Sequence, residues 1–523
     1  MPNVFKIASA NGLAACAVRV APGGEILVIA GRKAARLMRG PGGCAMTAAC
    51  TRFEPTGDGG AALARVTKLV LGLAPREIPE RVMERAALLL LDTLGVAAAA
   101  MPTRPGVIAR ETALRLHGTQ DPAFSARLLF DGRRVSLAGA AFAAATAIDN
   151  LDAHDGYNPT KGHIGVVALP TLAALAETLP FLSGPDALAA LVVGYEVAGR
   201  AATALHASVP EYHTSGAWNA LGVAAMVARL RRFTPRQLRE ALGIAEFHGP
   251  RSQMMREIAT PTMLHDGSSA GALIGVTSAI QAELGFTGAP AVTVEAPEVA
   301  SHWADLGEVW QVPLQYIKPY PTCRWVHAAL DGLRALFAAH DFTAADVVRV
   351  DVRSFFNAVA LFAGVPDSTS RAQYSMHFPL AAMLVHRRVG AEHIAGAGLT
   401  DPAVIAMMAR IHVAEDPLHT RQYPARRMAE VAVTLRDGRV LESGPVDARG
   451  GPEAPFDRDQ IVAKFHEFAD PALGRIRARA IRERVLGLTA EESRFADVAA
   501  LVHDAPPAPG RGIGPDRGID EMS

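Results

Sequence analysis

Apolar and polar residues recur with a helical period along the first half of the chain, from about residue 63 onward. In the segment ERVMERAALLLLD, Val82, Ala86 and Leu90 form one apolar stripe with charged residues on the opposite side. This spacing is typical of helices that bury one face. No pattern of two short strands joined by a turn interrupts it, so we predict an all-helical domain over residues 63–321.

The pattern changes after Lys318, where strand-like segments join the helices. The segment VVRVDVRS alternates apolar and polar residues, and MAEVAVTLRDGRVLESG does the same around a hairpin signal at Asp437–Gly438. We therefore predict a smaller α+β domain over residues 322–446 in a protein that is mostly α. Helical segments resume after it, so we expect residues 447–503 to return to the helical domain.

Both ends of the chain differ from the rest. Residues 1–62 are rich in Gly, Ala and Arg, poor in acidic residues and only weakly periodic. We interpret them as a poorly ordered extension or an upstream start, with a targeting peptide as the alternative. They lack the basic start, apolar run and cleavage site of a secretory signal. Residues 504–523 are rich in proline and glycine, which predicts a disordered tail.

Composition narrows the class of protein. Among the 523 residues, Lys and Arg number 52 and so do Asp and Glu, so no net charge attracts nucleic acid or a membrane surface. Four cysteines are too few for a disulfide framework in so long a chain, which favours a reducing cytoplasm. Asp92 interrupts one of the two longest apolar runs, and Glu177 with two prolines interrupts the other, so we expect no membrane span.

Titratable residues crowd into the segment DNLDAHDGYNPTKGH, just ahead of the apolar run IGVVALPTLAALAE. A helix start offers free backbone N–H groups and a positive dipole end, which suits an anionic substrate, and Lys161 and His163 would add to that site. Asp149 and Asp152 end the preceding apolar helix, where burial raises the pKa of a carboxyl group. Alternatively, both aspartates cap backbone groups and the lysine is solvated, although His154 has no such capping role.

Three further clusters place cations or histidines ahead of helix starts. They are YHTSG with His213 and Thr214, GPRSQ with Arg251 and Ser252 followed by His265 in LHDGSS, and KPYPTCRWVH with Lys318, Arg324 and His327. Arginine binds a carboxylate with two parallel hydrogen bonds, so the last cluster, stiffened by two prolines, suits a polycarboxylate. The alternatives are a structural histidine ahead of a helix and, for the last cluster, an interdomain linker with a surface cation.

Several common catalytic motifs are missing from the sequence. It has no GxGxxG after a strand, no Walker loop, no HExxH and no GxSxG. A metal held by His154, Asp155 and His163 is conceivable, but their spacing matches no familiar ligand set. We therefore predict a site without a metal.

Five segments, taken in order, resemble the MmgE/PrpD family over roughly residues 65–500. They are ERAALLLLDTLGVAAA, AIDNLDAHDGYNPTKGHIGVVALPTLAALAE, YHTSGAWNALGVAA, KPYPTCRWVHAALDGL and QYSMHFPLAAMLV. The family includes 2-methylcitrate dehydratase, cis-aconitate decarboxylase and iminodisuccinate epimerase. The resemblance implies a large helical domain, a smaller α+β lid domain, a homodimer, and an active site between the domains that needs no organic cofactor.

The resemblance also assigns site residues. Its catalytic positions fall on Asp149, His163, His213 and Lys318. At two positions the chain departs from the family pattern, because Thr262 stands where members have a lysine and Phe378 where they have an active-site tyrosine. The chain therefore resembles a divergent branch, marked by the motif TKGH.

The resemblance implies a lyase of the 2-methylcitrate dehydratase type, which removes a proton next to a carboxylate of a hydroxy-di- or tricarboxylate and eliminates water. Asp149 and His163 would share the base and acid roles, with His213 orienting the substrate. The residues expected to bind carboxylates are Lys161, Arg251, Ser252, His265 and Arg324, together with Lys318. A decarboxylase, an epimerase and a binding protein without turnover are the alternatives, among which a fold cannot choose.

Overall fold

The computed structural model describes residues 5–7, 16–20, 26–29 and 58–505, which form parts of two compact units, residues 1–54 and 55–523. In the first unit, β1 (Phe5–Ile7), β2 (Cys16–Val20) and β3 (Ile26–Ile29) form an antiparallel sheet. The poorly ordered extension predicted for residues 1–62 and the disordered tail predicted for residues 504–523 fall largely outside the described residues, so both stay predictions.

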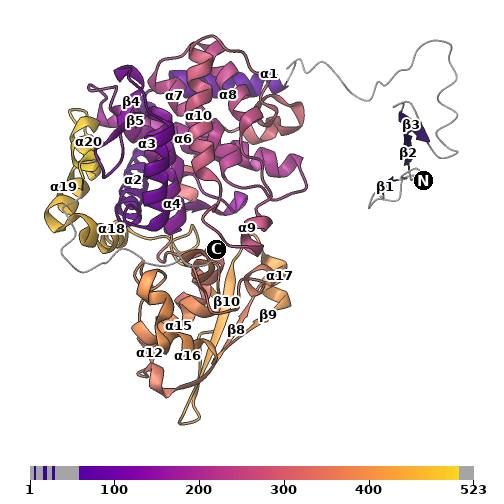
Figure 1. The fold of residues 1–523 in the computed structure, drawn as a ribbon, viewed down its shortest axis with the longest axis vertical. Coiled ribbons are helices and arrows are strands. Elements are labelled where there is room, and N and C mark those ends of the chain that lie inside the picture. Colours follow the sequence, from indigo (N-terminus) through magenta and orange to yellow (C-terminus); the bar gives the residue numbers. More distant parts are fainter. Residues whose placement is uncertain (1–4, 8–15, 21–25, 30–57, 506–523) are drawn as a thin grey trace. The chain divides into compact units, whose positions relative to one another are not determined.

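Packed helices make up the first part of the second unit, drawn from indigo to pink in Figure 1. They are α1 (Asp58–Thr67), α2 (Glu80–Ala100), α3 (Arg104–Leu116), α4 (Leu137–Leu151), α5 (Gly165–Ala176), α6 (Gly184–Ser208), α7 (Gly216–Leu230), α8 (Pro235–His248), α9 (Met255–Ala259), α10 (Ser268–Glu283) and α11 (Val292–Glu295). Helices α4, α5, α6 and α7 are almost wholly buried, because alanine, valine and leucine occupy most of their positions.

Small residues let the central helices approach closely. An added Cβ at Gly275 on α10 would lie 2.5 Å from the Val223 Cβ and 2.6 Å from the Ala220 carbonyl oxygen on α7. At Gly271, one turn earlier, it would lie 2.6 Å from the Gly216 carbonyl oxygen. The alanine-rich, aromatic-poor composition therefore reflects helices whose backbones nearly touch.

Two short ladders correct the prediction that this half is all-helical. β4 (Ser125–Arg127) pairs with β5 (Arg134–Ser136), and β6 (Gly156–Tyr157) pairs with β7 (Gln315–Tyr316). Strands this short carry no periodicity of their own, and β6 finds its partner far along the chain, so local patterns missed both. The β6–β7 ladder matters for the site, because it brings the loop after α4 against the segment that leads to Lys318.

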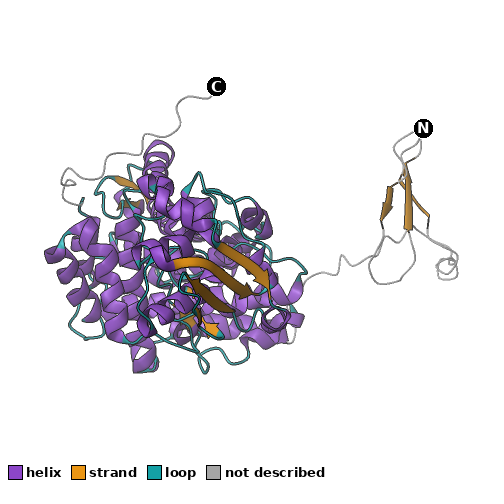
Figure 2. Cartoon of the chain, turned by 90° about the horizontal axis from the view of Figure 1, so that it is seen from below, coloured by secondary structure: helices purple, strands orange, loops and turns teal. Residues whose placement is uncertain are grey.

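A smaller α+β domain follows, drawn in orange in Figure 1. Its strands are β8 (Val347–Ser354), β9 (Ile411–Glu415), β10 (Met428–Leu435), β11 (Val440–Glu442) and β12 (Val446–Asp447), and its helices are α12 (His327–Ala339), α13 (Phe356–Val359), α14 (Thr369–Gln373), α15 (His377–His386), α16 (Pro402–Met408) and α17 (Pro417–Gln422). The sheet order is β11-β10-β8-β9, with β8 antiparallel to β10 and parallel to β9 (Figure 2). The predicted hairpin is confirmed, since β10 and β11 pair and Gly438 takes a φ of 89°.

The last helices, α18 (Arg458–Leu473), α19 (Arg475–Leu486) and α20 (Phe495–His503), join the hydrophobic core of the helical domain. On α18, the Lys464 ammonium pairs with Asp92 of α2 at 2.7 Å and donates to the Ala153 carbonyl oxygen at 2.7 Å. The α+β domain has a second core, which Met254 and Ile258 at α9 also join. The second unit therefore contains two cores, and residues between them can form a site.

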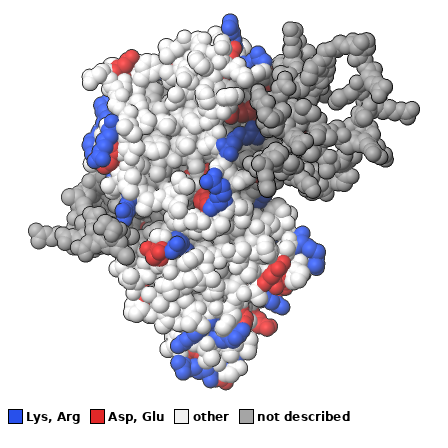
Figure 3. Space-filling view, turned by 45° about the vertical axis from the view of Figure 1, so that its right-hand side comes forward, with Lys and Arg blue, Asp and Glu red and all other residues white. Residues whose placement is uncertain are grey.

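Among the described residues, α6 is long and apolar enough to cross a membrane by length and composition, and α2 with α3 passes that test only as one span bent by 90°. However, 94% of the most apolar window of α6 is buried inside the fold, as in a core helix. On the face seen in Figure 3, basic and acidic side chains lie interspersed, as their equal numbers in the sequence would suggest.

The close contact of α7 and α10 predicts that adding one methyl group at Gly275 lowers the stability of the fold. Gly275→Ala should destabilise the protein by about 1–3 kcal/mol, because the two helices must separate to admit the Cβ. The control is Gly72→Ala, since Gly72 is exposed and nothing lies within 4 Å of an added Cβ. Urea and thermal unfolding would measure both, and an equal loss of stability at the two positions would contradict this account of the packing.

Candidate active site

A small, partly enclosed cavity lies where the helical domain meets the segment that enters the α+β domain. It is lined by Asp152, Lys161, His163, Tyr212, Met254, Ile258, Asp266, Tyr316, Lys318, Cys323, Arg324, Trp325, Tyr374 and Arg427. Its volume of about 30 Å³ holds no more than about two water molecules. Side chains from segments far apart in the sequence thus converge here, and they leave little empty volume between them.

Lys318 and Asp152 form a buried ion pair in this cavity. Burial by itself would lower the pKa of Lys318, but the neighbouring Asp152 and Tyr316 outweigh it and hold the pKa above its ordinary value, so the ammonium stays charged. Asp152 follows α4 in a left-handed conformation with a φ of 55°, which turns its side chain out of the helical path. Its Oδ2 has no hydrogen-bond partner among the described residues. A free carboxylate oxygen therefore stands beside a fixed positive charge.

His163 presents an unprotonated nitrogen to the same cavity. Its Nδ1 lies 2.6 Å from the Asp155 carbonyl oxygen, which only accepts, so Nδ1 carries the proton and Nε2 does not. Burial, reinforced by Lys318, lowers the pKa of His163 to about 3. The imidazole is therefore neutral near pH 7, and its Nε2 is available as a base.

A carboxyl group lies next to that nitrogen. Asp266 Oδ2 is 3.4 Å from His163 Nε2, and Asp266 Oδ1 accepts a hydrogen bond from Ser215 Oγ at 2.7 Å. The same Oγ accepts from the backbone N–H of His163 at 3.0 Å, which ties the two side chains together. Burial raises the pKa of Asp266, so this carboxyl group retains a proton more readily than an exposed one. Base and acid thus lie side by side.

Asp155 positions His163 through its carbonyl oxygen, and its side chain occupies the start of α5, where the substrate was expected to bind. Its carboxylate accepts from Tyr195 Oη at 2.6 Å and from the Gly165 N–H, the first residue of α5, at 3.0 Å. The prediction of a substrate anion at this helix start is therefore wrong, because the Asp155 carboxyl group already occupies it. Since the same carboxylate is turned toward α5, the described residues do not join His154, Asp155 and His163 into a set of metal ligands.

Asp149 and His265 lie outside the cavity lining. Asp149 Oδ2 accepts from the Ser268 N–H at the start of α10, the capping role considered as its alternative, and its Oδ1 is 3.6 Å from His154 Nε2. Burial, with a contribution from Asp266, raises the pKa of Asp149 well above its ordinary value. The buried His265 ring lies 5.7 Å from that of Tyr374, which does line the cavity. Both residues therefore lie behind the side chains that line the cavity.

Three cations of the cavity have no carboxylate partner among residues 58–505. Arg324 donates to the carbonyl oxygens of Arg449 and Ala448 at 2.7 and 2.9 Å, and burial lowers its pKa to about 10. Lys161 stands 4.2 Å over the Tyr212 ring, and Arg427 is buried with an unpartnered Nε. Unpaired buried charge is costly, so the cavity is poised for an anion.

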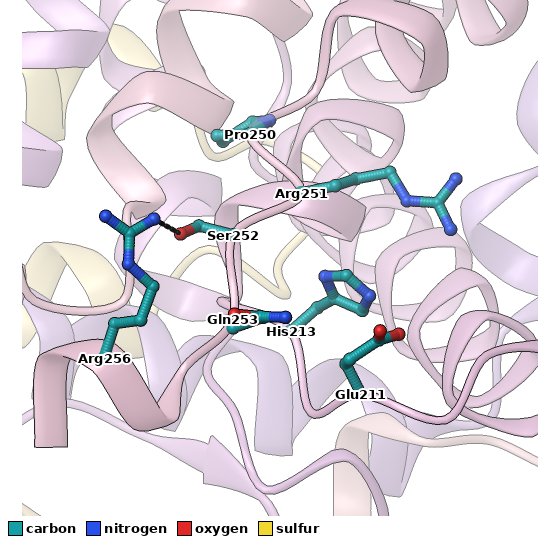
Figure 4. A pocket seen from close by; sticks show the side chains of 7 residues that line it. All are labelled: Glu211, His213, Pro250, Arg251, Ser252, Gln253 and Arg256. Atoms are coloured by element: carbon teal, nitrogen blue, oxygen red, sulfur yellow. Dashed lines mark hydrogen bonds between the residues drawn. The ribbon is translucent and has the colours of Figure 1, made fainter. Parts of the chain in front are cut away.

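The remaining predicted residues lie in a second, open pocket of about 390 Å³, shown in Figure 4. It contains His213, Arg251 and Ser252, with Arg256 donating to Ser252 Oγ at 3.4 Å. A bridge between His213 and Gln253 makes the wall that this pocket shares with the cavity. Since side chains alternate along extended chain, the neighbours of that bridge, Tyr212 and Met254, line the cavity instead.

Four of the residues predicted from the sequence line the cavity: Lys161, His163, Lys318 and Arg324. The local sequence pattern assigned no role to Asp266, although Asp266 adjoins His265, and it left Asp152 second to Asp149. It missed Arg427, for which no local signal exists: the residue precedes an ordinary strand, and only the chain fold carries it to the cavity.

Comparisons with known proteins agree with the resemblance described above. The model of the MmgE/PrpD N-terminal domain matches residues 64–307, and that of the MmgE/PrpD C-terminal domain matches residues 320–489. Cis-aconitate decarboxylase of Homo sapiens is 26% identical over 426 residues, covering 77% of this chain and 86% of the relative. The enzymes of the same name from Mus musculus and Aspergillus terreus are 24% and 22% identical, covering 78% and 82% of this chain and 86% and 93% of the relatives.

The raised pKa of Asp155 predicts how the stability of the fold depends on pH. Burial raises its pKa from 3.8 to about 7, so between about pH 4 and 7 the folded protein keeps a proton that the unfolded chain loses. This contribution therefore falls as pH rises across that window, by about 4 kcal/mol in total, and is constant above it. Asp155→Asn should remove that slope in urea unfolding measured from pH 4.5 to 8. Parallel curves for wild type and variant would show that Asp155 is ionised throughout.

Proposed function

Because the chain belongs to the MmgE/PrpD family, we propose that it is a cofactor-independent lyase that acts on a small polycarboxylate. The observation that carries this proposal is the small cavity in which the neutral His163 accompanies the buried Lys318–Asp152 pair. A base and a fixed positive charge in one small volume suit reactions that place negative charge on a carbon next to a carboxylate.

The substrate's carboxylates would supply the counter-ions that the cavity lacks. Lys161, Arg324 and Arg427 come from three separate segments and have no carboxylate partner among residues 58–505. Two arginines can each hold a carboxylate through two parallel hydrogen bonds, and the lysine adds a point charge. This inventory favours a substrate with at least two carboxylates over a monocarboxylate.

The two departures from the family pattern are consistent with this assignment. Thr262 is exposed, and its hydroxyl accepts from the Leu264 N–H at 3.3 Å, so the position of the family's lysine lies away from the cavity. Arg427 would replace that cation from the α+β side. Phe378 is fully buried outside the cavity lining, whereas the hydroxyl-bearing Tyr374 lines it and donates to Glu257 Oε1 at 2.7 Å.

Decarboxylation is the first candidate reaction, supported by the names of the curated relatives. The carbon–carbon bond to one carboxylate would break and release carbon dioxide. Its electron pair would move through the adjoining double bond toward a second carboxylate, where Lys318 and the arginines stabilise the charge. A proton from Asp266, passed directly or through His163, would then reach the far carbon and complete the product.

Elimination of water is the second candidate, favoured by the adjacent base and acid. His163 Nε2 would take the proton from the carbon next to a carboxylate. Asp266, whose pKa is raised by burial, would give its proton to the departing hydroxyl group, which leaves as water. The carbon–hydrogen and carbon–oxygen bonds are replaced by a double bond. The same first step without a leaving group would give epimerisation.

Within this proposal Asp152, rather than Asp149, is the catalytic aspartate. Asp152 lines the cavity and pairs with Lys318, and its unpartnered Oδ2 can accept a hydrogen bond from the substrate or orient it. Asp149 is one layer further back and caps α10. The distance in sequence is three residues, but only one of the two side chains reaches the reacting space.

Substrate entry requires the cavity to open. A volume of about 30 Å³ is far below the several hundred Å³ that a small-molecule site usually offers. The helical and α+β domains have mostly different hydrophobic cores, and Met254 and Ile258 of the helical domain pack into the core of the α+β domain next to the cavity, so we propose that the domains part there. Closure around the substrate would then exclude water from the charged intermediate.

The first test is proton NMR in deuterated water, with cis-aconitate and 2-methylcitrate as separate substrates. Formation of a decarboxylated alkene carrying deuterium would support the first candidate, and an alkene formed with loss of hydroxyl would support the second. Exchange of one proton without an alkene would indicate an epimerase. If no signal changes while either compound raises the melting temperature, the chain binds carboxylates without turnover and the proposal is wrong.

Two aspartate variants distinguish the assigned roles. Asp152→Asn should lower kcat by about 10²–10⁴, because it removes the charged partner of Lys318 and the group that orients the substrate beside the base. Asp149→Asn should stay within about tenfold of wild type, since burial already favours the neutral form of Asp149 and the amide keeps its shape. Melting temperatures would verify that both variants fold. The reverse ranking of the two rates would restore Asp149 as the catalytic residue.

A further inference from the structure

The α+β domain contains a second group of potential ligands, remote from the proposed reaction. Asp416, His419 and Glu430 each offer one ligand atom, and these three atoms lie within 4.8 Å of one another. Asp416 directly follows β9, His419 lies on α17, and Glu430 lies on β10. The side chains thus come from three elements that meet near the ends of β8 and β9.

His419 is the observation that points to a ligand. The residue is 1% exposed, and neither ring nitrogen has a hydrogen-bond partner among the described residues. A buried polar group without a partner costs free energy, so a native fold usually satisfies it. Its Nε2 lies 3.5 Å from Glu430 Oε1, too far for a good hydrogen bond, but close to the roughly 3.3 Å that separates two ligands on one tetrahedral zinc ion.

The carboxylates around His419 outnumber the arginine that pairs with them. Two carboxylates converge here, and Arg353 pairs with Glu430 through Oε2, which leaves Glu430 Oε1 directed toward the histidine. Asp416 accepts from the Leu418 N–H through Oδ1 at 2.8 Å, and its side chain offers one ligand atom to the group. One negative charge is left over, which favours a cation at the centre of the three ligand atoms.

We propose that Asp416, His419 and Glu430 bind a divalent transition metal, with Zn²⁺ the best match. One imidazole nitrogen and two carboxylate oxygens are ligands that Zn²⁺ accepts, and a site with three protein ligands completes its coordination with water. Arg353 pairs with Glu430 and the Leu418 N–H donates to Asp416, and such hydrogen bonds orient carboxylate ligands in metal sites. The proposal is independent of the reaction proposed above.

The metal would fix the segment that delivers Arg427 to the cavity. Between His419 and Arg427, the Tyr423 ring stacks on Phe355 at 4.7 Å and meets Trp325 edge-on at 6.0 Å. Trp325 and Arg427 both line the cavity. A metal that joins α17 to β10 would therefore brace both ends of the connection that carries the arginine. Its role is structural, because its ligands lie outside the cavity lining.

The test is metal binding by the full-length chain. The protein would be stripped with a chelator, equilibrated with Zn²⁺, desalted and analysed for metal by mass spectrometry. Wild type should retain about one equivalent more than His419→Ala, because three-ligand sites in folded proteins hold Zn²⁺ through desalting. The control is His412→Ala, which removes an exposed histidine from β9 and should retain as much Zn²⁺ as wild type.

A second ligand variant keeps the test decisive if His419→Ala fails to fold. Asp416→Asn keeps an oxygen for the Leu418 N–H, so α17 remains capped while one charged ligand is lost. Zn²⁺ should raise the melting temperature of wild type and His412→Ala, and should not raise that of Asp416→Asn or His419→Ala. Equal zinc content in wild type and both ligand variants would overturn the proposal.

Discussion

A buried ammonium group joins the helical domain to the segment that enters the α+β domain. Lys318 is 1% exposed and pairs with Asp152 at the end of α4. Taking two such charges out of water costs several kcal/mol each, so the pair persists only where the surrounding elements hold both partners in place. The end of α4 positions Asp152, and the β6–β7 ladder positions the segment before Lys318. The rest of the cavity, His163 included, is built around this contact.

The same constraint explains why the cavity is short of negative charge. Asp152 is committed to Lys318, and burial favours the protonated form of Asp266, so neither balances Lys161, Arg324 or Arg427. A polycarboxylate bound in the cavity would neutralise these positive charges. Its contacts with cations from both domains would then stabilise the closed arrangement of the domains. Binding, closure and stabilisation of a carbanion-like intermediate would then draw on one set of positive charges.

Local patterns predicted the elements whose side chains follow a period of their own. The stripes along α2 and α4 predicted helices, and Asp437–Gly438 predicted the hairpin between β10 and β11. Neither β6 nor β7 was foreseen, since two residues carry no period and the partner lies far along the chain. Asp149 and Asp152 could not be ranked either, because the left-handed turn that separates their directions appears only in the folded backbone.

The sequence by itself determined the family, the helical and α+β composition, and the chemical types that gather in the site, since each depends on residue identity and short-range spacing. Only the tertiary structure decided which groups meet and how they titrate. It gave the helix start of α5 to Asp155, put His213 and Arg251 in an outer pocket, and brought Arg427 into the cavity. The physical reason is that desolvation and Coulomb interactions depend on distance through space, which the order of residues along a chain does not contain.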